Sequence, residues 1–561
     1  MRPVALAALA LGVLVAPVAR AQAPAGRPSE EDMFGGAPPA APDAGASVGD
    51  GGTSQSKTAI PPDSTTTPPA PSAPTGEPAP GAPPAAANAA AATPPTSVPD
   101  RDQTLLGAEG SAPQHLSDYQ APENPLAIGG QLYLRSQTLA LQGQQPGDWT
   151  FSAPNLLDVY LDARPNPRVR AFVLGRMQFD PTAPPGSGVT TSISGSNGGA
   201  LAGTSATGFS SFTASRGPTS ILDQMWIRFD ILERVFVTAG KQHVRWGTGR
   251  FWQPTDYLHP IKRNPLDVFD ARPGQSMLKL HVPWEARGWN FYGFGVTEDP
   301  NQATNTLRQI AGGARAEIVI FDAELGLDML AKRGQPNRYG VDFSTGIWEL
   351  DVYADVGIRS GSDFCVVRAT NGGAPAPNPG GPCPPAVAPP MNESPDVAAQ
   401  AAMFDVGTLS GTKVQAVGGI NWSHKYNDND MFTVGGEYFY NQPGYADTSL
   451  YPGLLLNSNN TPLLNFFYTG RHYGAVFASF PAPYSWNLST FTISTLSNLT
   501  DQSFVSRIDY AYTLLTHLSL EAFVGVHYGH EHGEFRLGID LPEFHRDPSL
   551  LDLGIALRAK M

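Results

Sequence analysis

From Gly130 to the end of the chain, apolar and polar residues alternate with a period of two. The pattern is clearest in residues 347–359, where one parity is apolar and holds Trp348, Leu350, Val352, Ala354, Val356 and Ile358. The other parity carries Glu349, Asp351, Tyr353, Asp355 and Arg359. Such alternation is typical of half-buried β-strands, and segments of about 9–11 residues suit strands that cross a membrane at a tilt.

About 18 segments share this pattern, and 16–18 strands are expected. They lie near residues 130–141, 155–163, 167–179, 219–230, 234–242, 274–282, 288–297, 310–320, 323–332, 338–345, 347–359, 412–423, 431–441, 471–480, 487–497, 503–514, 518–528 and 549–561. Connections after odd-numbered segments include the long stretches 180–218, 243–273 and 360–411, whereas those after even-numbered segments are short. Long extracellular loops and short periplasmic turns are typical of bacterial outer-membrane barrels.

The sequence therefore predicts an all-β fold, a transmembrane antiparallel β-barrel over residues 126–561. The positions of five tryptophans agree with this topology, since all fall at or beside the predicted periplasmic strand ends: Trp284, Trp289, Trp348, Trp422 and Trp486. Aromatic girdles of this kind mark the level of the lipid headgroups.

The first 125 residues have a different character. Residues 1–21 have the pattern of a secretory signal, with Arg2 before an apolar stretch and a small-x-small cleavage site at Ala19-Arg20-Ala21. Residues 22–125 are rich in proline and alanine and poor in aromatic residues. Such a segment buries too little apolar surface to offset its ordering entropy, so we expect a disordered periplasmic tail.

One short motif interrupts this tail. Acidic residues lead into an isolated pair of apolar side chains, the members being Glu30, Glu31, Asp32, Met33 and Phe34. The motif is either a chance island or a short linear motif that binds a periplasmic protein partner by folding on it.

Composition and motifs exclude several classes of function. The formal net charge of −14 argues against nucleic-acid binding, which requires a basic surface. Residues 126–561 contain no G-x-S-x-G elbow, no H-E-x-x-H motif and no phosphate-binding loop. We therefore expect neither an enzyme nor a cofactor.

Charged residues on the predicted lumen parity fall into two groups. The third to fifth segments supply the basic residues Arg168, Arg170, Arg176, Arg228 and Lys241. The eighth to eleventh segments supply the acidic residues Glu317, Glu324, Asp328, Glu349, Asp351 and Asp355. A barrel of this size has room for an aqueous channel, so the two groups either create a transverse field across a constriction or are simply solvated lumen faces.

The connection 243–273 is dense in both charge and aromatic residues. Its basic residues are Arg245, Arg250, Lys262, Arg263 and Arg272, and its acidic residues are Asp256, Asp267 and Asp270. We expect this loop to fold inward, narrow the pore and place its cations near the acidic segments. The alternative is a surface loop that contacts lipopolysaccharide phosphates.

The same region resembles a known class of proteins. Gly240-Lys241-Gln242, Trp246-Gly247, Asn264-Pro265-Leu266-Asp267 and Arg272-Pro273-Gly274 are similar to a stretch found in proteobacterial outer-membrane barrels of the alginate-export and related porin-like families. The final segment, which is apolar on alternate positions to Met561, resembles the C-terminal strand of such barrels. The resemblance implies an outer-membrane channel.

Two further clusters contain cysteine or histidine residues. Cys365 and Cys383 lie in one predicted extracellular loop, where an oxidising compartment favours a disulfide over free thiols or a metal pair. His527, His530 and His532 stand close together with two glutamates and are candidate metal ligands. Because loop tips tolerate any polar residue, we expect no metal there.

These observations favour an outer-membrane porin-like channel for small polar or anionic solutes in a Gram-negative bacterium, in contact with outer-membrane lipid and lipopolysaccharide. The alternative is a barrel subunit of an envelope-spanning machine, for polysaccharide export, secretion or gliding motility, that binds periplasmic partners through its tail. An outer-membrane enzyme is a third alternative, which no residue spacing supports.

Overall fold

The computed structural model describes residues 125–166, 168–183, 216–259, 262–266, 272–297, 307, 310–333, 335–361, 364–369, 404–426, 431–456, 466–483, 486–541 and 544–561. The predicted signal segment 1–21 and the acidic-aromatic motif 30–34 lie outside these residues. No helix in the described part of the chain is long and apolar enough to cross a membrane.

In the described part of the chain the main sheet contains 19 strands; β2 (Thr150–Ser152) only extends the rim beside β1, and the other 18 form the barrel wall. The wall strands are β1 (Leu126–Leu141), β3 (Asn155–Asn166), β4 (Val169–Phe179), β5 (Thr219–Ile231), β6 (Val235–Gln242), β7 (Gln275–Trp284), β8 (Trp289–Val296), β9 (Ala311–Ile320), β10 (Ala323–Ala331), β11 (Asn337–Ile347), β12 (Leu350–Ser360), β15 (Thr412–Lys425), β16 (Met431–Asn441), β17 (His472–Pro481), β18 (Ser489–Asn498), β19 (Ser503–Leu515), β20 (Leu518–Gly529) and β23 (Ser549–Lys560). Each predicted segment contains one of them, so the predicted fold class is confirmed.

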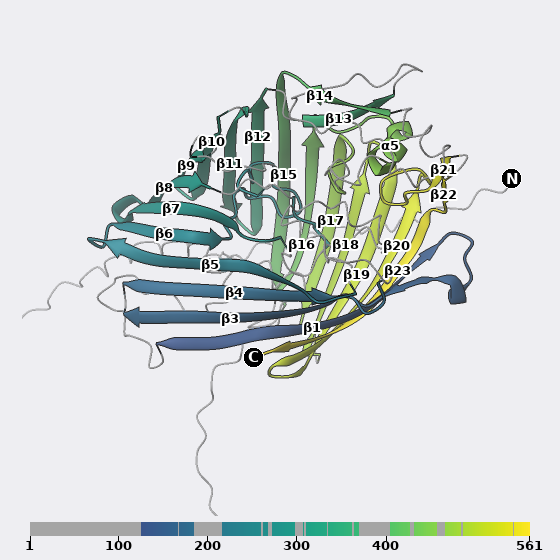
Figure 1. Ribbon diagram of the computed structural model, residues 1–561, viewed down its shortest axis with the longest axis horizontal. Coiled ribbons are helices and arrows are strands. Elements are labelled where there is room, and N and C mark those ends of the chain that lie inside the picture. Colours follow the sequence, from purple (N-terminus) through teal and green to yellow (C-terminus); the bar gives the residue numbers. More distant parts are fainter. Residues whose placement is uncertain are drawn as a thin grey trace, which may run out of the picture. The chain divides into compact units, whose positions relative to one another are not determined.

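The wall is a meander closed on itself (Figure 1). Each strand pairs antiparallel with the next in sequence, and the first strand also pairs with the last, from Gln131 opposite Lys560 to Ala140 opposite Leu551. Closure removes the open sheet edges that would otherwise expose unpaired N–H and C=O groups to lipid.

Connections of two kinds separate the two ends of the barrel. One end, the turn end, has the short connections, among them 232–234, 321–322 and 516–517. The other end, the loop end, has the long connections, which carry β13 (Phe364–Ala369), β14 (Phe404–Leu409), η5 (Thr448–Leu450), α5 (Tyr451–Leu456), β21 (Ile539–Leu541) and β22 (Phe544–Arg546). The five tryptophans predicted to form a girdle all lie at the turn end, as expected.

One turn differs from its predicted position. The hairpin between β11 and β12 turns at residues 348–349 rather than between the predicted segments 338–345 and 347–359, because Trp348 adopts a left-handed conformation with a φ of 57°. Its side chain is 87% exposed, as a girdle residue at the membrane surface would be.

Burial in the wall is the reverse of that in a water-soluble protein. Large apolar side chains are exposed on the outer face, for example Val476 at 59%, Ile555 at 52% and Met225 at 51%. Charged side chains are buried on the inner face, where Asp355 is 0% and Arg176 5% exposed. An apolar outer face and a polar interior are the arrangement of a β-barrel that spans a bacterial outer membrane.

This assignment predicts different costs for two arginine substitutions. Val356→Arg places a charge on the outer face in the middle of β12, opposite Val341 and Ala416, and should destabilise the barrel by about 2–4 kcal/mol. Ser344→Arg, on the inner face of the neighbouring β11, should cost much less because the guanidinium meets a polar interior. Urea unfolding in lipid vesicles measures both, and equal costs would contradict the assigned faces.

Candidate functional site

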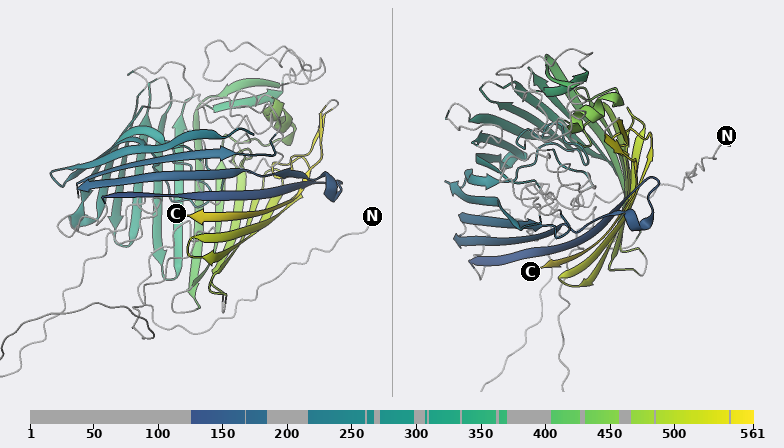
Figure 2. Two further views of the ribbon diagram at one scale, coloured as in Figure 1. Left: turned by 60° about the horizontal axis from the view of Figure 1, so that its bottom comes forward. Right: turned by 45° about the vertical axis from the view of Figure 1, so that its right-hand side comes forward.

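The loop between β6 and β7 runs through the interior of the barrel. Its described residues from Val244 to His259 are buried except Arg245, which is half-buried, and this coil lies inside the ring of strands (Figure 2, right). The expected inward fold of this loop is therefore observed for its described residues. We call residues 243–273 the constriction loop.

A single carboxylate holds the tip of the constriction loop. Glu437 of β16 accepts hydrogen bonds from three consecutive backbone N–H groups, those of Arg250 (2.7 Å), Phe251 (3.1 Å) and Trp252 (2.9 Å). The hydroxyl of Tyr353 donates a fourth bond to the same carboxylate at 2.8 Å. Because Glu437 lies on the wall far from β6 and β7 in the sheet order, these bonds fix the loop across the interior.

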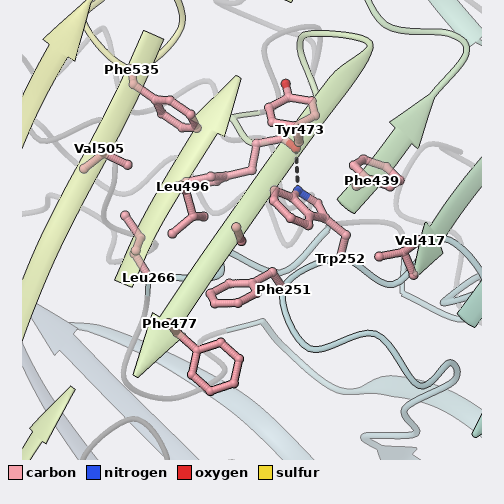
Figure 3. Packing of buried hydrophobic residues seen from close by; sticks show 12 residues of the cluster. Phe251, Trp252, Leu266, Val417, Phe439, Tyr473, Phe477, Leu496, Val505 and Phe535 are labelled. Atoms are coloured by element: carbon pink, nitrogen blue, oxygen red, sulfur yellow. Dashed lines mark hydrogen bonds between the residues drawn. The ribbon is translucent and has the colours of Figure 1, made fainter. Parts of the chain in front are cut away.

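Aromatic packing continues this anchor. Trp252 stacks on Phe439 with ring centroids 5.5 Å apart, and its indole Nε1 donates to the carbonyl of Phe467 at 2.9 Å. Tyr473 contacts the same indole at 5.5 Å (Figure 3). The cluster combines the constriction loop, the wall from β15 to β19 and the connections 442–471 and 530–548, its members being Phe251, Trp252, Leu266, Val417, Phe439, Phe467, Tyr473, Ala475, Phe477, Leu496, Val505 and Phe535.

A second part of the constriction loop is bound to β11 and β12. The hydroxyl of Thr255 donates to Asp355 at 3.0 Å, and that of Tyr257 donates to the carbonyl of Tyr339 at 2.9 Å. Gly247, with a φ of 90°, passes so close to Asp355 that a Cβ atom would overlap its carboxylate. The Trp246-Gly247 pair noted in the sequence thus marks a close approach of backbone to wall.

Three cations of the constriction loop contact carbonyls of the loop itself or an aromatic ring of the wall. The guanidinium of Arg250 lies 3.8 Å from the ring centroid of Phe477, and Arg245 donates to the carbonyl of Gly249. Lys262 donates to the carbonyls of Gln253 and Asp256. That the loop cations lie near the acidic segments stays a prediction.

An ion pair closes the base of the constriction loop. Arg272 donates to Asp256 at 2.9 Å, and the ring of His259 contacts the same carboxylate at 3.1 Å. Burial alone would raise the pKa of Asp256, but His259 and Arg272 outweigh it and hold that pKa below its usual value. Burial lowers the pKa of Lys262 to about 7, against the attraction of Asp256.

One arginine on the acidic segments partly neutralises their carboxylates. Arg315 of β9 binds Asp328 at 2.7 Å, Asp342 at 2.7 Å and Glu317 at 2.8 Å. Neither Arg315 nor Asp342 was singled out from the sequence, since only the register of β9 to β12 brings them together.

The remaining acidic candidates occupy different positions. Asp351 lies on the inner face of β12, as predicted. Glu349 lies in the exposed β11–β12 turn and accepts a bond from the indole of Trp422, so it is no part of a constriction. Its exposure follows from the position of the turn.

Three arginines of the basic segments also form ion pairs with carboxylates. Arg176 binds Asp158 at 2.8 Å, Arg170 binds Asp162 at 2.8 Å, and Arg168 binds Asp230 at 2.8 Å near the turn end. Asp158 and Asp162 lie on β3 and Asp230 lies on β5, the two strands beside β4. Arg170 and Arg176 lie on β4, and Arg168 directly precedes it. The predicted basic wall is therefore weaker in net charge than its arginines alone suggest.

Arg228 of β5 contacts a hydroxyl and an aromatic ring instead of a carboxylate. Its Nε donates to the hydroxyl of Thr238 at 3.3 Å, and its guanidinium lies 5.5 Å from the ring of Trp226. No carboxylate among the described residues binds it. It stands directly opposite Arg170 in the sheet, and Lys279 of β7 stands opposite Thr238 in the same row.

Lys241 lies on the other face. It stands opposite Met225 and Ser276, and Met225 is half exposed on the outer face. Directly opposed residues of a sheet share one face, so Lys241 is a correction to the predicted lumen set.

Several candidates lie outside the described residues or remain predictions. Asp267, Cys383 and the motif 30–34 are outside, and Arg263 is half-buried in the constriction loop. Cys365 lies in β13 and is not a free thiol, while its pairing with Cys383 stays a prediction. His527 contacts the carbonyl of Phe535. In the described part of the chain, which contains His530 and His532, no group of three His, Cys, Asp or Glu residues could hold a metal ion.

Comparisons with known proteins find similar structures only. No family model matches the chain, and no curated protein matches it. Solved structures similar to it include OccAB3 of Acinetobacter baumannii (9% identity, 78% of this chain and 99% of that chain covered, TM-score 0.41) and OprB of Pseudomonas putida (10%, 78% and 94%, TM-score 0.40). A mutant porin of Rh. blastica is similar with a TM-score of 0.35 at 10% identity, over 78% of this chain and 100% of that chain.

The Glu437 anchor makes a testable prediction. Glu437→Gln replaces one accepting oxygen with an amide that opposes the N–H donors, and should weaken docking of the constriction loop by about 2 kcal/mol. The expected result is faster proteolysis between Arg245 and His259 in the folded barrel. Glu324→Gln, at the turn end of β10, is the control, and equal proteolysis of the two variants would contradict the anchoring role.

Proposed function

We propose that the protein is an outer-membrane channel for small polar solutes, with a preference for anions, and that the constriction loop sets its narrowest part. The observation that carries the proposal is the docking of this loop across the interior, where Glu437 binds three of its N–H groups. A wall of 18 strands encloses more space than its own side chains fill, so a loop fixed inside it controls what passes.

The basic row on β4 to β7 supports the anion preference. Arg170, Arg228 and Lys279 lie in one row of inner-face positions, and Arg170 binds the carboxylate of Asp162. The hydrogen bond to Thr238 and the ring of Trp226 hold Arg228 in place, while its positive charge is not cancelled by a described carboxylate. A carboxylate or phosphate group on a solute would bind such a guanidinium.

Acidic residues occupy a separate arc of the same interior. Glu317, Glu324 and Asp351 lie on the inner faces of β9, β10 and β12 towards the turn end. Basic and acidic arcs at different positions around a narrow pore orient polar solutes that carry both hydrogen-bonding groups and charge.

By the usual asymmetry of outer-membrane barrels, we assign the loop end to the cell exterior and the turn end to the periplasm. The first strand begins at the turn end, so this orientation would direct residues 22–125 into the periplasm. A role as a barrel subunit of an envelope-spanning machine would depend on residues 30–34, and it predicts a barrel that does not conduct.

Planar-bilayer recordings of the purified full chain test the proposal. Steady conductance with a reversal potential that indicates anion preference is expected. In Arg228→Gln the ratio of anion to cation permeability should fall about two- to fivefold, since a unit charge roughly 8 Å from the ion path in water changes an ion's free energy by about 0.5 kcal/mol.

Arg168→Gln is the matched control, because Asp230 binds that arginine near the turn end and it is half exposed. An unchanged reversal potential in Arg228→Gln would remove the anion preference from this row. A protein that inserts but carries no current would overturn the channel assignment itself.

A further inference from the structure

Two carboxylates are buried together at the loop end without a cation. Asp501 lies in the β18–β19 turn and Glu534 in the connection 530–548, and both are at least 94% buried, with exposures of 6% and 1%. One amide nitrogen, Nδ2 of Asn498, donates to both carboxylates at 2.8 Å. No lysine or arginine within the described ranges binds either group. We call Asp501 and Glu534 the acid pair.

The other partners of the acid pair are neutral donors. Tyr473 of β17 donates its hydroxyl to Glu534 at 2.6 Å, and Tyr451 of α5 donates to Asp501 at 3.0 Å. Asp501 also accepts bonds from the backbone N–H of Glu534 and from Ser503. The pair thus joins β17, β18, β19, α5 and the connection 530–548.

Charged groups on the same connection point elsewhere. Arg536 donates to the carbonyls of Ser549 and Gly529, and His527 of β20 contacts the carbonyl of Phe535. Two carboxylates in one dry site cannot both ionise without a large cost, because no cation balances them. Burial and the charge of Asp501 raise the pKa of Glu534 to about 7.

The acid pair is two contacts away from the constriction loop. Glu534 accepts a hydrogen bond from the backbone N–H of Phe467, and the carbonyl of Phe467 accepts the indole N–H of Trp252. Tyr473, which donates to Glu534, also packs against the ring of Trp252 (Figure 3). Two of the groups that bind Glu534, Phe467 and Tyr473, therefore also contact Trp252 of the constriction loop.

We propose that the carboxyl of Glu534, buried beside Asp501, carries a proton and forms a latch that keeps the constriction loop seated through Phe467 and Trp252. Loss of that proton places a negative charge beside Asp501 in a buried site, and the repulsion displaces Glu534 together with its donors Phe467 and Tyr473, which releases the Trp252 side of the loop. Glu437 still holds the backbone of residues 250–252, so the loop loosens rather than leaves. The gating consequence rests on the proposed channel function.

Hydrogen exchange on the full-length barrel in lipid vesicles tests the latch directly. After correction for intrinsic exchange, peptides containing Trp252 and Phe467 should exchange more at pH 8.5 than at pH 5.5, with a midpoint near pH 7. The sign follows from the raised pKa: the folded state holds the proton up to about pH 7, so the seated loop loses stability as pH rises from 4.5 through 7.

Glu534→Gln keeps the shape of the protonated side chain and should exchange slowly at both pH values. Glu531→Gln is the control, since that exposed carboxylate of the same connection binds Gln142 and should leave the wild-type pH dependence unchanged. If Glu534→Gln does not fold, Asp501→Asn removes the same charge pair and should likewise abolish the pH dependence. Exchange in the wild type that does not change with pH, or a pH dependence that persists in both variants, overturns the latch.

Conductance separates the two proposals. A latch in an active channel predicts larger conductance at pH 8.5 than at pH 5.5 in the wild type and none of that difference in Glu534→Gln. If exchange depends on pH but the barrel carries no current, the channel assignment fails and the latch stands. If the barrel conducts and neither readout depends on pH, the latch fails and the channel stands.

Discussion

The interior of this barrel is organised by one buried carboxylate. Three consecutive N–H groups of the constriction loop lose their water when the loop enters the barrel, and each would cost about 1–3 kcal/mol if left unpaired. Glu437 accepts all three, and its remaining charge is stabilised by the hydroxyl of Tyr353. The position of Trp252, and with it the aromatic packing on β16 and β17, follows from this bond set.

A second feature of the polar interior is that many of its buried charges have a partner of opposite charge nearby. Arg315 already binds the carboxylates of β9, β10 and β11, and Arg272 already binds Asp256 within the constriction loop. The described contacts that dock the loop on the wall include hydroxyls, backbone N–H groups and aromatic rings, which give it a fixed position.

The aromatic cluster around Trp252 makes the mouth and the constriction one mechanical unit. Its members come from the constriction loop, from β15 to β19 and from both connections that carry Phe467 and Phe535. Close-packed protein interiors transmit a shift of one side chain to its neighbours. A change at the loop end, where Glu534 binds Phe467, would thus reach Trp252 of the constriction loop.

The sequence by itself determined the wall. Alternation with a period of two is a local property of each strand, and the outer face must be apolar at every second position, so the strands and their faces could be predicted residue by residue. The turn between β11 and β12 was misplaced because Trp348 takes a conformation that its residue type does not favour. Lys241 was assigned to the wrong face because a polar residue near a strand end does not by itself indicate a face.

The tertiary structure alone decided the site. The inward fold of the constriction loop could be expected from its density of charge and aromatic residues, but not the partner that holds it. Glu437 lies 185 residues beyond Trp252 in the chain, and nothing in either local sequence encodes their contact. The acid pair and the Arg315 cluster arise in the same way, because strand register and loop docking bring together residues whose individual positions carry no signal. Local alternation determines on which face of the wall a side chain lies. Only the closed barrel, with its strand register and docked loop, determines which residues that side chain contacts.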